Sequence, residues 1–342
     1  MNQPVSIEDL RHVLDHTRDL WEELRGRRIF VTGGTGFFGC WLLETFAFAN
    51  DQLKLDAKLT ALTRDPAAFR ANTPHLARHP AIDLRQGNVK DFEFPEGEFS
   101  HVIHAAVDYC APLELFTSNV DGARRTLEFA VKAKAAKYLL TSSGAVYGPQ
   151  PPEVTHVAED DMRAPDTMQI RSAYGEAKRA SEFLCAAYHA QYEIETKIAR
   201  GFAFVGPYLP VTGASAIGNF INDALKGGPI NINGDGTPYR SYLYGADLAI
   251  WLWTILFKGQ PCRPYNVGSA DAVSIEETAR AVADVVHPGA EIKIAGQPVP
   301  GQPAGRYVPS VNRAKEELGL EPWIDLHEGV RRTAAWHRKQ TQ

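Results

Sequence analysis

Short apolar runs alternate with longer stretches of helical periodicity over residues 26–201 of the chain. The runs have the length of strands, and in the stretches between them apolar positions recur every three or four residues. Six runs stand out: Ile29–Val31, Leu59–Thr63, Ile82–Gln86, Val102–His104, Tyr138–Thr141 and Thr196–Phe202. This alternation predicts an α/β fold with a doubly wound parallel sheet and helices on both of its faces. A functional site is then expected at the carboxyl ends of the strands.

The pattern is different on both sides of this region. Residues Ser6 to Leu24 have helical spacing with Ser6 as N-cap, which predicts an N-terminal helical extension over residues 1–25. Beyond Gly206, short helices, loops and a few strands predict a smaller C-terminal substrate lobe over residues 204–342. Residues 264–269 are expected to return to the main sheet, and the apolar stretch from Asp247 to Phe257 to form a buried helix.

Three glycines follow the first apolar run at G-x-x-G-x-x-G spacing. They are Gly33, Gly36 and Gly39, and a helical pattern begins at Phe37. Glycine lets a dinucleotide pyrophosphate approach the backbone, where the N–H groups and the positive end of the helix bind it. Glycine-rich turns without a ligand also occur, but a strand before and a helix after the turn favour a ligand site. Residues 26–203 are therefore predicted to form a dinucleotide-binding domain of Rossmann type.

The end of the second run bears on the choice of dinucleotide. Arg64 follows Thr63 there, and a guanidinium can pair with a 2′-phosphate, which favours NADP. Asp65 keeps NAD open, because a shift of the strand end by one residue would bring its carboxylate to the ribose. The turn after the third run contains Asn88 and Val89 and is suited to holding the adenine edge.

Tyr174 and Lys178 are four residues apart in a helical pattern, so their side chains share one helix face. The ammonium is expected to stabilise the phenolate and lower the pKa of the phenol, which would make Tyr174 a proton donor or acceptor near neutral pH. The spacing Y-x-x-x-K is weak by itself. It becomes strong after the glycine turn and the serine-rich strand end at Ser143.

Composition and charge narrow the choice of partners. The chain has 342 residues, a formal net charge of −5 and no block of Lys and Arg, which argues against nucleic acid or an anionic membrane as partner. Its four cysteines are far apart without a C-x-x-C pair, so neither a disulfide framework nor a metal site is indicated. The longest apolar run, Leu248 to Phe257, is too short to span a bilayer. A cytoplasmic protein with a small-molecule substrate is expected.

Taken together, these motifs resemble those of the extended short-chain dehydrogenase/reductases, in the nucleotide-sugar epimerase/dehydratase branch. The resemblance runs from about Gly26 to Trp336 and depends on T-G-G-T-G-F-F-G, H-A-A, N-V-D-G, S-S-G-A-V-Y-G, Y-G-E-A-K and G-D-G-T-P-Y-R-S-Y-L-Y-G-A-D-L. It implies a catalytic triad in which Ser143 binds the substrate oxygen, Tyr174 is the acid/base and Lys178 holds the nicotinamide ribose. It also implies a homodimer that pairs through the helix carrying Tyr174 and the crossover helix before it.

The resemblance assigns the remaining contacts residue by residue. The residues expected to contact the cofactor are Gly33, Thr35, Gly36, Phe37, Phe38, Gly39, Thr63, Arg64, Asn88, Val89, Ala105, Ala106, Asn119, Tyr174 and Lys178. Those expected to bind the nucleotide diphosphate of the substrate are Asn219, Arg240 and Arg306. Arginine suits that role because its planar fork binds phosphate oxygens in pairs.

Departures from the family pattern point to the reaction. The 4,6-dehydratases of this branch carry Asp-Glu directly after the residue that matches Ser143, whereas this chain has Gly144 and Ala145. The glutamate of the related decarboxylases is likewise Ala145, and the asparagine common before Val-Gly-Pro is missing. What remains is hydride and proton transfer. We therefore expect NADPH-dependent reduction of a 4-keto-(6-deoxy)hexose, with a nucleotide-sugar 4-epimerase that holds NAD tightly as the alternative. A dehydratase, a decarboxylase and a non-catalytic NADP-binding protein are less favoured.

Overall fold

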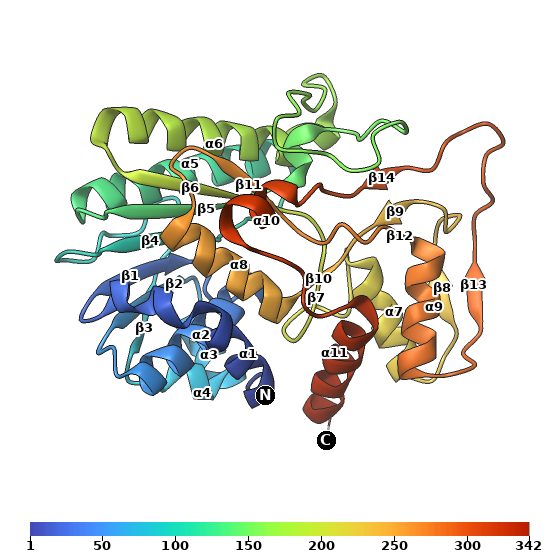
Figure 1. Ribbon diagram of the computed structural model, residues 1–342, viewed down its shortest axis with the longest axis horizontal. Helices are drawn as coiled ribbons and strands as arrows, with labels where there is room; N and C mark the ends of the chain where they lie inside the picture. The colour runs from blue at the N-terminus through green and yellow to red at the C-terminus, as the bar shows by residue number, and fades with distance from the viewer. Residues whose placement is uncertain (342) are drawn as a thin grey trace.

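The computed structural model describes residues 1–341. Its centre is a parallel sheet of seven strands in the order β11-β6-β5-β4-β1-β2-β3 (Figure 1). The strands are β1 (Arg28–Thr32), β2 (Lys58–Thr63), β3 (Ile82–Gln86), β4 (His101–His104), β5 (Lys137–Ser143), β6 (Glu195–Gly201) and β11 (Pro264–Val267). The doubly wound parallel sheet predicted from the alternating pattern is confirmed.

Helices cover both faces of this sheet. On one face α5 (Pro112–Lys132) packs along α6 (Ala173–Tyr192), and on the other α2 (Phe37–Leu53) packs against α8 (Gly245–Lys258). The crossovers between the strands also contain α3 (Pro66–Asn72), α4 (Pro74–Ala77), η2 (Gly144–Tyr147) and η3 (Ile170–Ser172). The predicted buried helix from Asp247 to Phe257 is confirmed, since every one of these residues is buried in α8.

The N-terminal helix joins parts of the chain that are far apart in sequence. In α1 (Ile7–Thr17), Ser6 caps the first turn and accepts a hydrogen bond from the N–H of Asp9 (3.1 Å), as the sequence predicts. The helix and the following η1 (Arg18–Leu24) pack against α8. The buried carboxylate of Asp9 accepts hydrogen bonds from Tyr244 (2.9 Å) and from Arg332 of α11 (Leu326–Thr341). The extension thus ties the main domain to the C-terminal helix.

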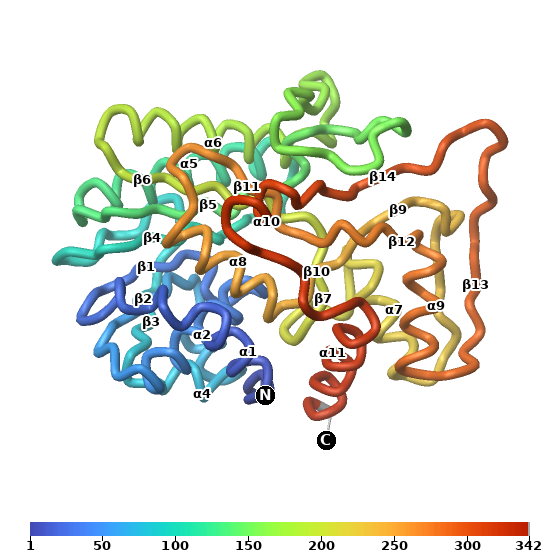
Figure 2. The backbone as a smooth tube through the Cα atoms, in the orientation of Figure 1, coloured from blue at the N-terminus to red at the C-terminus, as the bar shows by residue number. Residues whose placement is uncertain are grey.

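The C-terminal part forms a smaller lobe beside the sheet (Figure 2). It contains α7 (Ala216–Leu225), α9 (Ile275–Val286) and several very short strands. These strands are β7 (Phe204–Val205), β8 (Ile230–Ile232), β9 (Tyr239–Arg240), β10 (Leu243–Tyr244), β12 (Val273–Ser274), β13 (Ile292–Ile294) and β14 (Arg306–Tyr307). The chain leaves the lobe for β11, which pairs with β6, and later for α10 (Asn312–Leu318). The proposed domain limits at residues 25/26 and 203/204 stay predictions.

Candidate active site

The glycine turn between β1 and α2 is shaped by close backbone packing. Gly33 has φ +71°, and a Cβ on it would lie 2.5 Å from the backbone carbon of Ala105. A Cβ on Gly39 would lie 2.2 Å from the carbonyl oxygen of Gly33. Gly36 is different, because the nearest atom to its Cβ would be 3.6 Å away. The fold itself requires Gly33 and Gly39, whereas glycine at position 36 leaves space on the cleft side of the turn.

The first turn of α2 is free to bind an anion. Gly36 is its N-cap residue and no side chain caps the helix, so the leading N–H groups have no side-chain partner. These groups and the positive end of the helix dipole attract negative charge. The turn therefore fits the pyrophosphate of a dinucleotide. Because Gly36 has no side chain, the phosphates can approach its backbone closely.

A cleft of about 540 Å³ opens at the carboxyl ends of the strands, within the range usual for ligand sites. Most of the residues predicted to contact the cofactor line it, namely Gly33, Thr35, Gly36, Phe37, Phe38, Thr63, Arg64, Asn88, Val89, Ala105, Ala106 and Tyr174. Ser143 lines it as well. The other three, Gly39, Asn119 and Lys178, are buried and do not line it.

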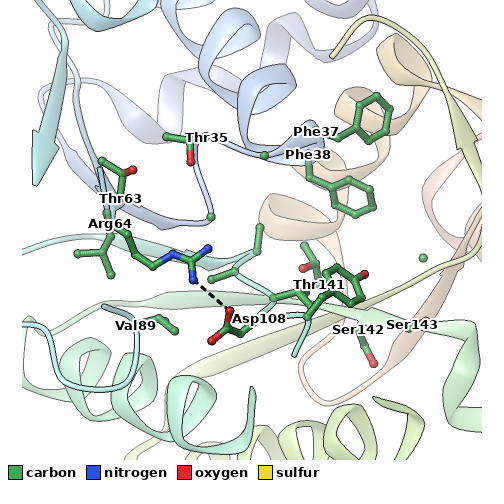
Figure 3. A pocket seen from close by; sticks show the side chains of 18 of the residues that line it. Thr35, Phe37, Phe38, Thr63, Arg64, Val89, Asp108, Thr141, Ser142 and Ser143 are labelled. Carbon is green, nitrogen blue, oxygen red and sulfur yellow. Dashed lines mark hydrogen bonds and ion pairs between the residues drawn. The ribbon is translucent and has the colours of Figure 1, made fainter. Parts of the chain in front are cut away.

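The end of β2 presents an arginine rather than a carboxylate to the cleft. Arg64 lines it with a side chain 70% exposed, and its Nη1 lies 3.1 Å from Oδ1 of Asp108 (Figure 3). Asp65 instead accepts a hydrogen bond from the N–H of Ala68 (2.9 Å) and caps α3. The carboxylate that kept NAD open in the sequence is thus engaged in a helix cap.

The three residues of the predicted triad converge at the end of β5. Oγ of Ser143 accepts a hydrogen bond from the N–H of Ala145 (3.1 Å). On α6, the ammonium of Lys178 is buried, lies 5.8 Å from the ring centre of Tyr174 and donates to the carbonyl oxygen of Thr141 (2.9 Å). Burial lowers the pKa of Lys178 to about 8. The structure brings the triad together, and its catalytic role stays a prediction.

The prediction that Lys178 lowers the pKa of Tyr174 is wrong. The pKa of Tyr174 is raised, first by burial and then by the neighbouring phenols Tyr109 and Tyr307, while a hydrogen bond from Ser143 lowers it. Lys178 points to a carbonyl oxygen instead of the phenol oxygen, so it does not offset the burial. Tyr174 is accordingly a neutral phenol, which suits it as a proton donor.

Two tyrosines outside the predicted catalytic and binding residues lie beside Tyr174. The ring of Tyr109 lies 5.8 Å from that of Tyr174, centre to centre, although the Tyr109 side chain is 76% exposed. The hydroxyl of Tyr307 lies 3.4 Å from Oγ of Ser143, a contact between residues 164 positions apart. Asp108, Tyr109 and Cys110 fall where the family resemblance places substrate-specific groups, whereas nothing in the sequence singles out Tyr307.

The predicted substrate residues lie outside the residues that line the cleft. The Arg306 guanidinium stacks on the ring of Tyr239 at 4.3 Å, and that of Arg240 lies 6.0 Å from the ring centre of Tyr307. Asn219 on α7 donates to the carbonyl oxygen of Gly213 (2.9 Å). Arg240 is therefore near the triad through Tyr307, whereas Arg306 and Asn219 are not brought to it.

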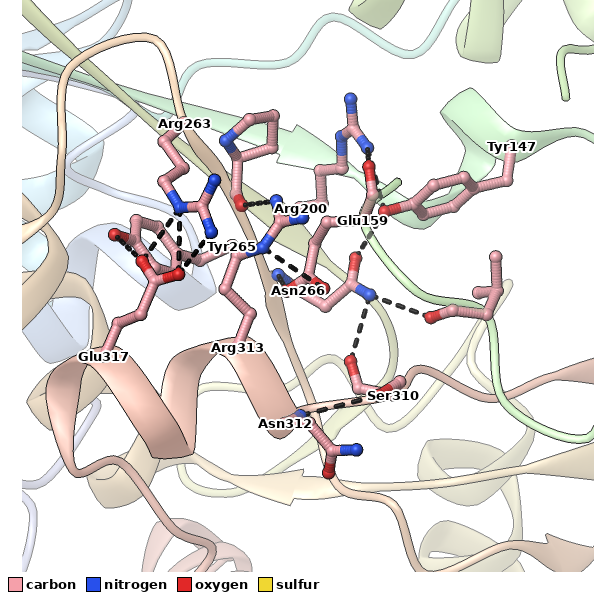
Figure 4. A network of polar contacts seen from close by, with 12 residues as sticks. Tyr147, Glu159, Arg200, Arg263, Tyr265, Asn266, Ser310, Asn312, Arg313 and Glu317 are labelled. Carbon is pink, nitrogen blue, oxygen red and sulfur yellow. Dashed lines mark hydrogen bonds and ion pairs between the residues drawn. The ribbon is translucent and has the colours of Figure 1, made fainter. Parts of the chain in front are cut away.

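A polar network joins β6 to β11: Arg200 donates to the hydroxyl of Tyr147 (2.8 Å), which in turn donates to Oδ1 of Asn266 (2.7 Å) (Figure 4). Arg200 on β6 pairs with Glu182 of α6 (2.7 Å), and Glu182 also accepts a hydrogen bond from Ser142 (2.5 Å). Asn266 of β11 donates to the carbonyl oxygens of Val157 and Ser310 (2.9 and 3.0 Å). The network fixes the strand ends and the loop after η2 in one arrangement.

Within residues 1–341, no group of three or more His, Cys, Asp or Glu side chains could hold a metal ion. None of the helices described has the length and apolar character needed to cross a bilayer.

Comparison with known proteins gives concordant results. A sequence profile of the NAD dependent epimerase/dehydratase family matches residues 29–268. UDP-glucuronic acid decarboxylase 6 of Arabidopsis thaliana is 32% identical over 311 residues, covering 89% of this chain and 86% of that protein. The fold is similar to that of an epimerase from Methanothermobacter thermautotrophicus, with TM-score 0.80 and 22% identity over 96% of this chain and 97% of that one. It is also similar to dTDP-glucose 4,6-dehydratase from Streptomyces venezuelae solved with NAD, with TM-score 0.76 and 23% identity over 91% and 97%.

Proposed function

The chain belongs to the NAD dependent epimerase/dehydratase family, and from that premise we propose that it is an NADPH-dependent reductase of a nucleotide-diphosphate 4-keto-6-deoxyhexose. Ser143 and Tyr174 at the cleft, with Lys178 buried 5.8 Å from the ring centre of Tyr174, support an oxidoreductase. Arg64 at the cleft supports the 2′-phosphorylated cofactor. Such a reductase exchanges its cofactor at each turnover.

One observation carries the choice of reaction: the strand end after Ser143 carries Gly144 and Ala145 and so holds no second acid or base. A Cβ on Gly144 would lie 2.6 Å from the ring of Phe202, so an aspartate at this position would meet the ring. Ala145 has no titratable group. The family's dehydratases and decarboxylases use acidic residues at these positions to transfer protons, and this chain has none there. Ketone reduction needs only one proton donor.

Each residue of the site has its own role in the proposed ketone reduction. The glycine turn would bind the pyrophosphate of the cofactor, and Arg64 its 2′-phosphate. Lys178 would hold the nicotinamide ribose. Bound NADPH would supply a hydride to the carbonyl carbon. Tyr174, a neutral phenol, donates its proton to the carbonyl oxygen, and Ser143 hydrogen-bonds the same oxygen so that developing negative charge is stabilised.

The test is a substrate comparison with the purified protein. We expect NADPH oxidation with dTDP- or UDP-4-keto-6-deoxyglucose and formation of the 4-hydroxy sugar, identified by mass and NMR. Release of carbon dioxide from UDP-glucuronic acid would instead support the activity of the Arabidopsis relative. Interconversion of UDP-glucose and UDP-galactose without net cofactor change would support the 4-epimerase. Either result, without ketone reduction, would reject the proposal.

Cofactor preference is expected to depend on Arg64. In the Arg64→Ser variant, KM for NADPH should rise about tenfold or more, because a charge-assisted pair with the 2′-phosphate is lost. KM for NADH should change less than about twofold, since that cofactor has no 2′-phosphate. Steady-state kinetics with both cofactors measures this, and Arg70→Ser, on the exposed side of α3, is the matched control. An equal loss with both cofactors would contradict the role of Arg64.

We also propose a homodimer that pairs through α5 and α6. The two helices lie side by side on one face of the sheet, and Phe183 in the middle of α6 is 72% exposed. Light scattering should give twice the mass of the chain, and Phe183→Glu should give the monomer, because an interface does not accept an unpaired charge. A wild-type monomer at micromolar concentration would contradict the dimer.

A further inference from the structure

The segment that carries Tyr307 is held firmly against the loop after η2. The N–H of Val308 donates to Oε1 of Gln150 (2.9 Å), and its carbonyl oxygen accepts from the N–H of Val157 (3.0 Å). The Tyr307 ring lies 4.7 Å from the ring of Phe202, centre to centre. Tyr307 of the C-terminal lobe is therefore fixed against the end of β5, from which it is distant in sequence.

Tyr307 and the preceding Arg306 face opposite sides of β14. β14 runs parallel to β9, with Arg306 opposite Tyr239 and Tyr307 opposite Arg240. Successive residues of a strand face opposite sides, so Arg306 with Tyr239 and Tyr307 with Arg240 form two separate pairs. Only the second pair faces Ser143.

The oxygen of Ser143 lies among several hydrogen-bonding groups. A serine hydroxyl has one proton to donate and two acceptor positions. The N–H of Ala145 fills one acceptor position (3.1 Å). The Tyr307 hydroxyl lies 3.4 Å from Oγ and can fill the second. Among the hydrogen bonds of the described residues, it has one other acceptor, the carbonyl oxygen of Gly201, also at 3.4 Å, and there Tyr307 can only be the donor.

We propose that Tyr307 is a positioning residue that donates its proton to Ser143 and thereby directs the Ser143 proton toward Tyr174 and the substrate oxygen. With both acceptor positions of Ser143 filled by donors, its own proton has only that direction left. Ser143 then hydrogen-bonds the oxygen that receives negative charge, and stabilises the phenolate of Tyr174 once its proton has been transferred. Burial raises the pKa of Tyr307 to about 12, so this phenol keeps its proton at neutral pH.

The opposite arrangement makes a contrary prediction. If Tyr307 donated to Gly201, Ser143 could donate to Tyr307 and would be drawn away from Tyr174. Removing the Tyr307 hydroxyl would then leave the acidity of Tyr174 unchanged or increase it. The sign of the change in the Tyr174 pKa therefore distinguishes the two arrangements.

The first measurement needs no substrate. The protein is labelled with 3-fluorotyrosine, whose phenol is more acidic than tyrosine, and Tyr174 is titrated by 19F NMR after its signal is assigned with Tyr174→Phe. In Tyr307→Phe we expect the midpoint for Tyr174 to rise by roughly 0.5 to 1 pH unit, the size of one modest hydrogen bond. Ser143→Ala should raise it as well, and adding Tyr307→Phe to that variant should cause no further rise. An unchanged or lower midpoint in Tyr307→Phe, or a full further rise in the double variant, overturns the proposal.

The second measurement rests on the proposed function. In the wild type, Tyr307→Phe should lower kcat for ketone reduction about tenfold and leave KM for NADPH unchanged. When Tyr307→Phe is added to Ser143→Ala, kcat should fall by less than about twofold. Equal losses in both backgrounds would overturn action through Ser143. Tyr239→Phe, which removes a hydroxyl on the opposite face of β9, is the control and should change neither measurement. If the wild type reduces no keto sugar, the proposed function fails, and the titration still decides the role of Tyr307.

Discussion

Tyr174→Phe is expected to lower kcat for ketone reduction by about 1,000-fold, the loss typical of removing a general acid. In the proposed mechanism Tyr174 is the proton donor, and burial raises its pKa, so that the phenol is neutral before the reaction. Phenylalanine retains the ring and its contact with Tyr109 but has no proton to give. NADPH consumption under saturating keto sugar measures the loss.

The matched control for this variant is Tyr192→Phe. Tyr192 is exposed at the end of the same helix, where its hydroxyl contacts only the side chain of Gln191 among the hydrogen bonds described. It should retain full activity. NADPH affinity in Tyr174→Phe, followed by cofactor fluorescence, should stay within a few-fold of wild type. Undiminished biological activity of Tyr174→Phe would favour a non-catalytic NADP-binding protein over the reductase.

Gly39→Ala is expected to destabilise the fold by about 3 kcal/mol or more, and Gly36→Ala to leave it nearly unchanged. The added Cβ would lie 2.2 Å from the backbone oxygen of Gly33 in the first variant, whereas the nearest atom is 3.6 Å away in the second. Gly36 also has φ −88°, which alanine adopts freely. Urea unfolding measures both free energies.

The same pair of variants separates folding from binding. Gly36→Ala should keep its stability and still lose at least about tenfold in NADPH affinity, because the methyl group occupies the space where a pyrophosphate must approach the backbone. Isothermal titration calorimetry measures this loss. Unchanged affinity in Gly36→Ala would show that the glycine turn is structural and that the anion lies elsewhere.

Much of the fold could be predicted because its main elements have a regular pattern. Ile82–Gln86 is β3 with the same bounds, and Leu59–Thr63 is β2 without its first residue. Strands such as β9 and β14 have two residues each, too few for any periodicity, and their pairing depends on the path of the whole C-terminal lobe. The small sheet that they form could not be predicted for this reason.

The same limit applies to the candidate site. Spacing along the chain is enough to place Tyr174 over Lys178 and to identify the glycine turn, since both are local. The acidity of Tyr174 is not local, because it depends on burial and on the nearby phenols Tyr109 and Tyr307. Tyr307 itself approaches Ser143 from the far end of the chain, and only tertiary packing reveals it.

The ring of Phe202 limits which substitutions at position 144 could convert this protein into an eliminating enzyme. Because the ring lies beside Gly144, an aspartate at 144 requires the Phe202 ring to shift or position 202 to become smaller. The two positions are therefore coupled, and a change at 202 also reaches Tyr307, whose ring Phe202 contacts. A mutational path from this sequence toward an eliminating enzyme would thus disturb the surroundings of Tyr307 as well as those of Gly144.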